Sequence, residues 1–484
     1  MINRIRNVWS NQSSDIKTLG KGLFWSMFGS MISRGLLFLA WVIIARILGQ
    51  EHYGEYGLIR NTVMMFATFA GSGMGQAATK FVAEFFHKDR IKAERIAALI
   101  TRIGTITGST IFIIAFLLSP YIAENTIHAP WLVNEFRVAS LVLLFSTINS
   151  VQVGVLEGLG LFKKVASINT INGIISLPLF VLGAYYGGVY GSVIAYCLSI
   201  MLLCVLSSWH IRKQKLSGHF AFNYKDCWQE RKIILVFILP ALLGGIVVLP
   251  IKWVTDVLLV NSSGFSQMGV FTAAMTINII INSIAVMLNS PFLNIISKTK
   301  GSGSLRLERL NIFVPWLIGI LFAFPLIMFP DLGGLVFGKE YAGRQFNQVF
   351  IFIIVYTLVL MYKQGFGRLF ALHNLQWIAL LSNAIWGGSL VVSFLLIKSL
   401  GAVGLSISYV IATIFSTIIV YPYIIKKGYI SYQFVISPFV IVIWVITAIL
   451  VLFALLNFSV LLNIVIFSIL FSSTLYLFYK ELKK

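Results

Sequence analysis

Apolar residues occur along the chain in long runs, separated by short polar segments. A membrane-spanning helix needs about 20 mostly apolar residues in succession, and each run is close to that length. We interpret fourteen runs as membrane spans, at residues 22–48, 55–79, 96–118, 132–156, 166–186, 189–210, 233–259, 267–290, 309–330, 346–368, 374–397, 402–425, 433–456 and 459–479. The loops between them are short. The pattern therefore predicts an all-α polytopic membrane protein with about 14 transmembrane helices and no extramembrane domain.

The pattern also repeats within the chain, at an interval of 213–215 residues. Gly188-x-x-Gly191-x-x-Ile194-x-Tyr196 recurs as Gly401-x-x-Gly404-x-x-Ile407-x-Tyr409, Asn169-x-Ile171-x-Gly173 recurs as Asn383-x-Ile385-x-Gly387, and Gly54-x-Tyr56 has a looser counterpart in Gly269-x-Phe271. Six spans separate the copies, so both copies have the same orientation in the membrane. The alternative is an accidental match of helix-packing glycines, which are common in membrane helices.

The repeat predicts two parallel six-helix lobes around a central cavity, followed by two C-terminal helices. We expect a cytoplasmic tail at 1–19, an N-lobe at 20–210, a cytoplasmic connecting loop at 211–232, a C-lobe at 233–426, and helices thirteen and fourteen at 427–484.

Composition and charge agree with a membrane protein. Hydrophobic residues make up 58% of the chain and charged residues only 11%, against about 25% charged in soluble domains. These values exclude an ordinary soluble enzyme, a disordered chain and a nucleic-acid-binding protein, despite the net charge of +21. When loops are assigned to alternating sides, 28 of the 37 Lys and Arg residues fall on one side and three on the other. This bias predicts that both termini are cytoplasmic and that the span count is even, with twelve spans still open.

The sequence contains no arrangement typical of catalysis or of a tightly bound cofactor. The cysteines, Cys197, Cys204 and Cys227, have neither the number nor the spacing of a disulfide framework or a zinc site. No phosphate-binding glycine-rich loop and no nucleophile with partners at a known spacing occurs. We therefore expect no metal site and no cofactor, and a function driven by a coupling ion (H⁺ or Na⁺), by the membrane potential or by substrate flux.

A family resemblance rests on the junction of the first two spans. Ala45-Arg46-Ile47-Leu48-Gly49, followed by Tyr53-Gly54-Glu55-Tyr56, resembles the A-R-x-L-G-x-x-x-Y-G-x-Y signature of polysaccharide flippases of the O-antigen (Wzx) type. These belong to the multidrug/oligosaccharidyl-lipid/polysaccharide exporter superfamily. The segments Gly71–Gly75, Ala78-Thr79-Lys80-Phe81-Val82-Ala83 and Leu156-x-Gly158-x-Gly160 are similar to the same family.

The resemblance implies a V-shaped bundle that moves a lipid-linked oligosaccharide from the cytoplasmic to the outer leaflet by alternating access. The partners it implies are a polyprenyl-pyrophosphate-linked glycan such as an O-antigen unit of lipopolysaccharide, membrane lipids and other glycan-assembly proteins. The location it implies is a bacterial inner membrane. Members of the family diverge widely, so the sugar is not specified.

Three candidate binding residues lie in the first two spans. Charges inside a span are costly and usually face a cavity or a partner. Arg34 lies near the middle of the first span, and Trp41 shares its helix face two turns later. A guanidinium pairs well with phosphate oxygens, and an indole can stack on a sugar. The alternative for Arg34 is a structural bond between helices to a backbone carbonyl. Arg60, within two turns of the outer end of the second span, is a further candidate, and its alternative is snorkelling to the outer surface.

Five more candidates lie in the second half of the chain. Lys252 and Asp256 are four residues apart on the seventh span and can form an internal ion pair, or one of them can bind an anion or a coupling ion. Asn278 and Asn282 share a face of the eighth span and either bind sugar or bond between helices. Lys363 lies somewhat deeper than the end of the tenth span.

These residues favour a flippase for a polyprenyl-pyrophosphate-linked oligosaccharide. The alternatives are a lipid II flippase, which also needs a cationic cavity, a cation-coupled multidrug exporter, and a membrane glycan polymerase or ligase. An exporter of organic cations needs buried acids, and the first lobe has none deep in a span. A polymerase or ligase typically needs a sizeable outer loop, and the longest expected outer loops, 119–131 and 331–346, are short.

Overall fold

The computed structural model describes residues 14–71, 73–218, 220–231, 247–288, 292, 305–373, 375–456 and 458–483. Throughout these residues the chain is helical, with turns between helices and no β-strand. The all-α class predicted from the sequence is therefore confirmed. Residues 1–13 of the expected tail and 233–246 of the expected seventh span lie outside the described residues.

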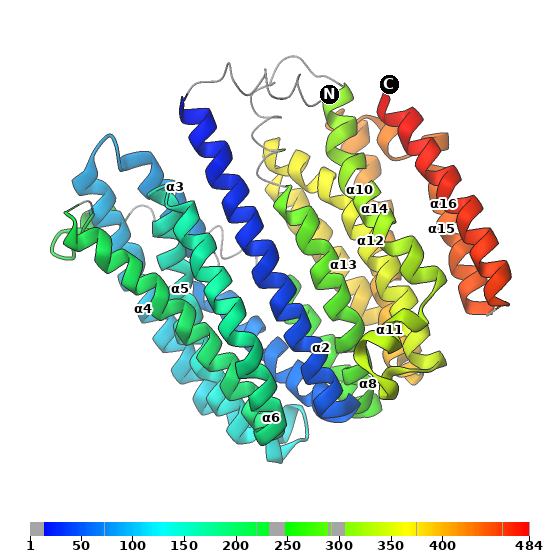
Figure 1. The fold of residues 1–484 in the computed structure, drawn as a ribbon, viewed down its shortest axis with the longest axis horizontal. Helices are drawn as coiled ribbons and strands as arrows, with labels where there is room; N and C mark the ends of the chain where they lie inside the picture. The colour runs from blue at the N-terminus through cyan, green and yellow to red at the C-terminus, as the bar shows by residue number, and fades with distance from the viewer. Residues whose placement is uncertain are drawn as a thin grey trace. The chain divides into compact units, whose positions relative to one another are not determined.

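The α-helices are shown in Figure 1. They are α2 (Ser14–Gly71), α3 (Met74–Phe85), α4 (Arg90–Tyr121), α5 (Val133–Gly158), α6 (Phe162–Leu216), α8 (Val248–Met287), α10 (Leu305–Met328), α11 (Asp331–Phe337), α12 (Arg344–Leu372), α13 (Gln376–Ile397), α14 (Gly401–Lys426), α15 (Pro438–Leu456) and α16 (Val460–Lys483).

Among the described residues, ten helical segments are long and apolar enough to cross a membrane. Four of them turn back at a glycine with positive φ: α2 at Gly49, α6 at Gly188, α8 at Gly264 and the α13–α14 segment at Gly401. Each of these four holds two apolar helices, so the arrangement is compatible with the fourteen spans predicted.

These four turns reveal the internal repeat in the backbone itself. Gly49 (φ 71°, ψ −179°) and Gly264 (φ 85°, ψ 172°) have nearly the same conformation, and they are 215 residues apart. Gly188 (φ 54°, ψ −132°) and Gly401 (φ 56°, ψ −131°) match even more closely at 213 residues. Positive φ is costly for residues with a Cβ atom, so glycine is required at all four turns. The two halves of the chain therefore share one topology.

The chain divides into two compact units. Unit 1 contains residues 1–44 and 59–246, and unit 2 contains residues 45–58 and 247–484. The turn of α2, which the sequence pattern places in the first lobe, thus packs with the second half of the chain.

Two glycines bring the turn of α2 against α8 within unit 2. A Cβ atom on Gly54 would lie 2.0 Å from the carbonyl oxygen of Phe265, and one on Gly269 would lie 1.8 Å from that of Gln50. Gly54 and Gly269 are equivalent in the repeat, as are Gln50 and Phe265. The two contacts are therefore related by a local two-fold symmetry, and both need bare backbone at the crossing.

Hydrogen bonds fix the same turn to the segment between α10 and α12. Arg46 donates from Nε to the carbonyl of Val336 (2.8 Å) and from Nη2 to that of Leu335 (2.5 Å). The backbone N–H of Gln50 donates to the Glu340 carboxylate (3.0 Å), and its side-chain amide donates to the Glu340 carbonyl (2.5 Å). Arg46 and the glycines of the sequence signature thus hold unit 2 together.

Unit 1 packs its helices through small residues. A Cβ atom on Gly154 of α5 would lie 2.2 Å from the carbonyl oxygen of Gly75 of α3, so the two backbones nearly touch. Gly71 and Gly75 in turn lie against Thr147 and Ser150 of α5. Close approach through small residues is the usual way to pack helices in lipid, where the hydrophobic effect between helices is weak.

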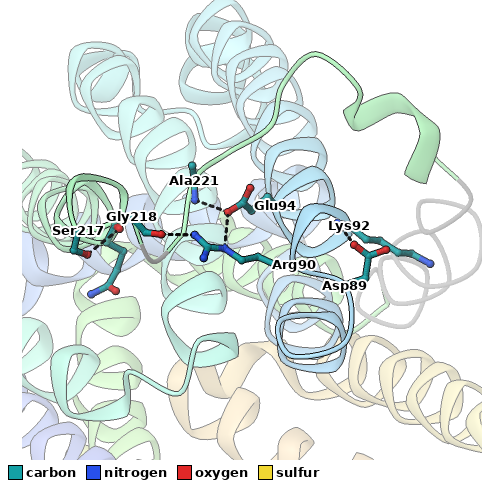
Figure 2. A network of polar contacts seen from close by, with 8 residues as sticks. Asp89, Arg90, Lys92, Glu94, Ser217, Gly218 and Ala221 are labelled. Carbon is teal, nitrogen blue, oxygen red and sulfur yellow. Dashed lines mark hydrogen bonds and ion pairs between the residues drawn. The ribbon is translucent and has the colours of Figure 1, made fainter.

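The segment after α6 folds back onto α4 instead of crossing freely to unit 2. Figure 2 shows Arg90 bonded to Glu94 (3.2 Å) and to the carbonyl of Gly218 (2.5 Å), while Glu94 accepts from the backbone N–H of Ala221 (3.0 Å). Phe220 is 1% exposed and packs against Ile96 and its neighbours. Cys227 is fully buried against Ala98 and Leu99.

Unit 2 ends with α15 and α16, which run side by side at the red end of the colour bar (Figure 1). An aromatic cluster joins them to α10, with Trp316 packed edge-on against Phe439 and Phe478. Arg309 of α10 forms an ion pair with Glu481 of α16 at 3.4 Å. The last two helices are therefore attached to the rest of unit 2 through α10.

Candidate functional site

A buried arginine forms the centre of the candidate site in unit 1. Arg60 lies on the second helix of α2 and is 5% exposed. Its guanidinium carbon lies 4.9 Å from the centroid of the Trp41 ring, on the first helix of α2. Trp41 precedes the Gly49 turn by eight residues and Arg60 follows it by eleven, which places both about 12–16 Å from the turn. The fold therefore brings two predicted site residues together inside the span.

The charge of Arg60 is not neutralised. Its Nε and Nη1 atoms are buried and have no hydrogen-bond partner, and among the described residues it forms no ion pair. A buried, unpaired charge is costly, so such a group is a candidate for a functional site. The Trp41 face compensates part of the cost through a cation–π contact.

Tyr196 of α6 completes this group, and the sequence analysis did not single it out as a site residue. It interacts electrostatically with Arg60. It follows the Gly188 turn by eight residues, which gives it the same depth as Trp41. The signal was present in the sequence, because Tyr196 closes the repeated motif that begins at Gly188. We call Trp41, Arg60 and Tyr196 the Arg60 cluster.

Arg34 stands apart from this cluster along the helix. It precedes Trp41 by seven residues, or two turns, so it shares its helix face. Its side chain is exposed, and it has no bonded partner among the described residues. Arg34 is therefore available on the same face of α2 as the indole.

Unit 2 has an equivalent group of different charge. Tyr409 is the repeat counterpart of Tyr196, and Asp256 precedes the Gly264 turn by eight residues, as Trp41 precedes Gly49. Asp256 is 2% exposed and interacts electrostatically with both Tyr409 and Lys252. The Lys252 ammonium lies 5.9 Å from the Tyr409 ring centroid. Here a carboxylate and a cation occur together, whereas the Arg60 cluster carries a cation alone.

Aromatic rings surround the Tyr409 position. Tyr356 lies 5.0 Å, Phe271 5.5 Å and Trp386 5.9 Å from it, measured between ring centroids. Tyr409 itself is 1% exposed. Asp256 and Lys252 therefore lie beside an aromatic wall inside unit 2.

The remaining predicted residues bond between helices of unit 2. Asn278 donates to the hydroxyl of Thr357 (2.8 Å), and Asn282 accepts from the amide of Gln364 (2.7 Å). Lys363 donates to the hydroxyl of Ser416 (3.2 Å). These contacts tie α12 to α8 and α14, and they use the polar atoms that a sugar would otherwise bind.

Arg368 is a buried cation whose bonding the sequence did not indicate. It donates from Nε to the side-chain oxygen of Asn311 (2.6 Å) and from Nη2 to the Asn311 carbonyl (2.7 Å).

No group of His, Cys, Asp and Glu residues suited to a metal ion occurs in the described part of the chain.

Comparison with known proteins identifies a matching family and relatives of this chain. Residues 19–300 match the family model described as "Polysaccharide biosynthesis protein". A curated relative, the "Uncharacterized membrane protein MJ1375" of Methanocaldococcus jannaschii, is 22% identical over 82% of this chain and 95% of its own length.

Solved structures share the fold. One is described as the inward-facing conformation of a multidrug resistance MATE family transporter of the MOP superfamily, with TM-score 0.66, 17% identity, and coverage of 81% of this chain and 94% of that one. Another, a MOP superfamily transporter from Pyrococcus furiosus, has TM-score 0.60, 18% identity, and coverage of 86% and 98%. The family match extends over more than half of the residues, and the chain therefore belongs to the polysaccharide biosynthesis protein family and has the fold of MOP superfamily transporters.

Proposed function

We propose that this protein is a flippase of the O-antigen (Wzx) type, which moves a polyprenyl-pyrophosphate-linked oligosaccharide across a membrane by alternating access. One observation carries the proposal. Arg60 is buried within a membrane-spanning helix, with its Nε and Nη1 atoms unbonded and no carboxylate paired with it in the described residues.

The Arg60 cluster suits both chemical parts of such a substrate. A guanidinium forms directional, charge-assisted hydrogen bonds to pyrophosphate oxygens. The Trp41 ring and the Tyr196 hydroxyl add a stacking surface and a hydrogen-bonding group, which suit a sugar. Arg34, exposed on the same helix face as Trp41, supplies a second cation for a ligand with several negative charges.

The comparisons support the substrate class without specifying it. The matched family is described by polysaccharide biosynthesis. The Pyrococcus furiosus neighbour is described by a reverse polarity of its binding pocket that suggests a different function. The cationic Arg60 cluster agrees with an anionic substrate. A lipid II flippase has the same chemical requirement, and its substrate is therefore included in the test.

The test measures binding of a short-chain polyprenyl pyrophosphate to the purified protein. Arg60→Ala removes the guanidinium and is expected to raise Kd by about 10–100-fold, because each charge-assisted bond contributes about 1.5–3 kcal/mol. Arg60→Lys retains the charge but lacks the forked guanidinium, so its Kd should lie between those of the wild-type protein and Arg60→Ala. Flipping of a lipid-linked oligosaccharide and of lipid II in proteoliposomes then separates the two substrates.

Arg102→Ala is the matched control. Arg102 is an exposed arginine of the same unit, 5.7 Å from the Trp228 ring centroid, and has no place in the cluster. Its loss should leave Kd unchanged. Wild-type binding and transport by a correctly folded Arg60→Ala protein would contradict the proposal.

A second candidate function, export of organic cations, is favoured by Asp256. A buried carboxylate beside Tyr409, Tyr356 and Trp386 could hold a cationic drug or a coupling ion, and Lys252 counters that charge. Binding of tetraphenylphosphonium that is lost in Asp256→Asn, together with no binding of polyprenyl pyrophosphate, would favour the exporter.

A further inference from the structure

An apolar groove runs between α12, α14 and α15 in unit 2. Its volume is about 570 Å³, and its lining is almost entirely apolar, with Phe352 at one end and Tyr362 and Trp444 at the other. The hydroxyl of Tyr362 bonds to the carbonyl of Phe434, and the Trp444 ring packs against Tyr362 and Trp316. An aromatic floor therefore closes the far end.

The groove is long enough to hold part of a hydrocarbon chain. On α12 the lining runs from Phe352 to Tyr362, ten residues that rise about 15 Å. The hydrocarbon core of a bilayer is about 30 Å thick, so the groove covers about half of that depth, and it lies in the middle of α12. A hydrocarbon chain that enters from the helix ends past Ile351 can extend along the groove as far as the aromatic side chains of Tyr362 and Trp444.

A second pocket, with both apolar and polar residues in its lining, adjoins the groove at the end that contains Leu455. This pocket, of about 630 Å³, lies where α10 and α15 end and α12 and α16 begin, and it shares Leu455 with the groove. Its lining includes Arg344, Asp331, Asn347 and Asn463. The two cavities together fit an amphiphilic ligand, whose polar head group would lie at the helix ends and one of whose chains would lie in the groove.

The polar atoms of the pocket indicate which head group it takes. Asn347 donates its amide N–H to the Asp331 carboxylate (2.6 Å), which fixes the orientation of that amide. The side-chain oxygens of Asn347 and Asn463 are buried and have no donor, and Asn463 is only 8% exposed. Two unmet acceptors and a carboxylate call for a cation with several N–H groups, while the exposed Arg344 suits a phosphate.

We propose that this pocket and groove form a binding site for an aminophospholipid, a membrane lipid with a phosphoethanolamine head group. The primary ammonium donates to Asp331, Asn347 and Asn463, the phosphate pairs with Arg344, and one chain fills the groove beside Ala448. A bound lipid of this kind fastens α15 to α12 and α14. The site is independent of the proposed transport function.

Native mass spectrometry of the purified protein with added phosphatidylethanolamine, phosphatidylcholine and phosphatidylglycerol tests the site. We expect phosphatidylethanolamine to bind at least tenfold more tightly than phosphatidylcholine, whose head group has no N–H donor. Phosphatidylglycerol, which lacks the ammonium, should also bind more weakly. Ala448→Trp fills the groove and should reduce binding at least tenfold, whereas Val445→Trp, on an exposed neighbouring position of α15, should not.

Substitutions of the protein residues that would contact the head group test the pocket without altering the groove. Asn463→Leu and Asp331→Asn should reduce the preference for phosphatidylethanolamine over phosphatidylcholine, and Arg344→Gln should weaken binding of both lipids. Lys339→Gln, an exposed cation close by in the chain and outside the pocket, is the control. Equal binding of the three lipids, undiminished binding to Ala448→Trp, or displacement of the lipid by a polyprenyl phosphate would each overturn the proposal.

Discussion

Bare backbone at two glycines determines whether the turn of α2 can pack on α8. Gly54 and Gly269 each face a carbonyl oxygen at a distance that no Cβ atom can occupy, and that oxygen belongs to a main chain that cannot move alone. The sequence marked these positions through the repeat and the family signature. It could not show that they face each other, because the crossing depends on tertiary packing.

Gly54→Ala should therefore destabilise the protein. Overpacking by one methyl group costs typically about 1–3 kcal/mol, and a clash with backbone should reach or exceed the top of that range. Thermal unfolding in detergent measures the effect as a lower Tm. Gly367→Ala is the control, since a Cβ atom there meets nothing within 4 Å. Equal melting temperatures for the two variants would show that the backbones do not cross as described.

Individual polar residues show why the site was only partly predictable. The position of a charge inside a span is visible in the sequence, and the structure shows that Arg60 and Asp256 are buried. Whether a polar group is already bonded is not visible. Asn278, Asn282 and Lys363 are also polar residues inside predicted spans, yet the structure bonds them to Thr357, Gln364 and Ser416 of neighbouring helices.

At the scale of helices, apolar runs predicted the elements well and their ends less well. The expected second span, 55–79, includes the end of α2 at Gly71 and the start of α3 at Met74, because Gly73 adopts a left-handed conformation between them. The docked segment after α6 was not predicted at all. Its polar composition indicated a loop, and only the folded chain shows that Phe220 and Cys227 are buried on α4 and its neighbours.

Phe220 should act as the anchor of this docked segment. Truncation of a fully buried phenylalanine costs about 3–5 kcal/mol, enough to release a short segment from its surface. Phe220→Ala should therefore speed the reaction of Cys227 with a maleimide, measured by mass spectrometry of the cysteine-containing peptide. Tyr224→Ala, in the same segment but 48% exposed, should leave the rate unchanged. A slow rate in both variants would place the anchor elsewhere, such as in the Arg90–Glu94 network of Figure 2.

For the whole molecule, the repeat predicted from short motifs is confirmed by the backbone of the four turns. The division into two units is not simply that of the sequence halves, because residues 45–58 belong with the second unit. Composition could not have shown this, since the chain simply continues through α2. The reason is physical: Arg46, Gln50 and Gly54 all find their partners in unit 2.

The orientation of the chain in the membrane follows from its charge, and we expect both termini to be cytoplasmic. Of the 37 Lys and Arg residues, 28 were assigned to the side of the termini, including Lys427, and only three to the opposite side, including Lys398. Lys398 lies in the turn before α14, and Lys427 lies at the C-terminal end of α14. Both side chains are exposed. A membrane-impermeant maleimide should therefore label Lys398→Cys in intact cells and Lys427→Cys only after lysis. The native cysteines are buried and provide a low background. Labelling of Lys427→Cys in intact cells would reverse the orientation, and with it the direction in which the proposed flippase presents its Arg60 cluster to substrate.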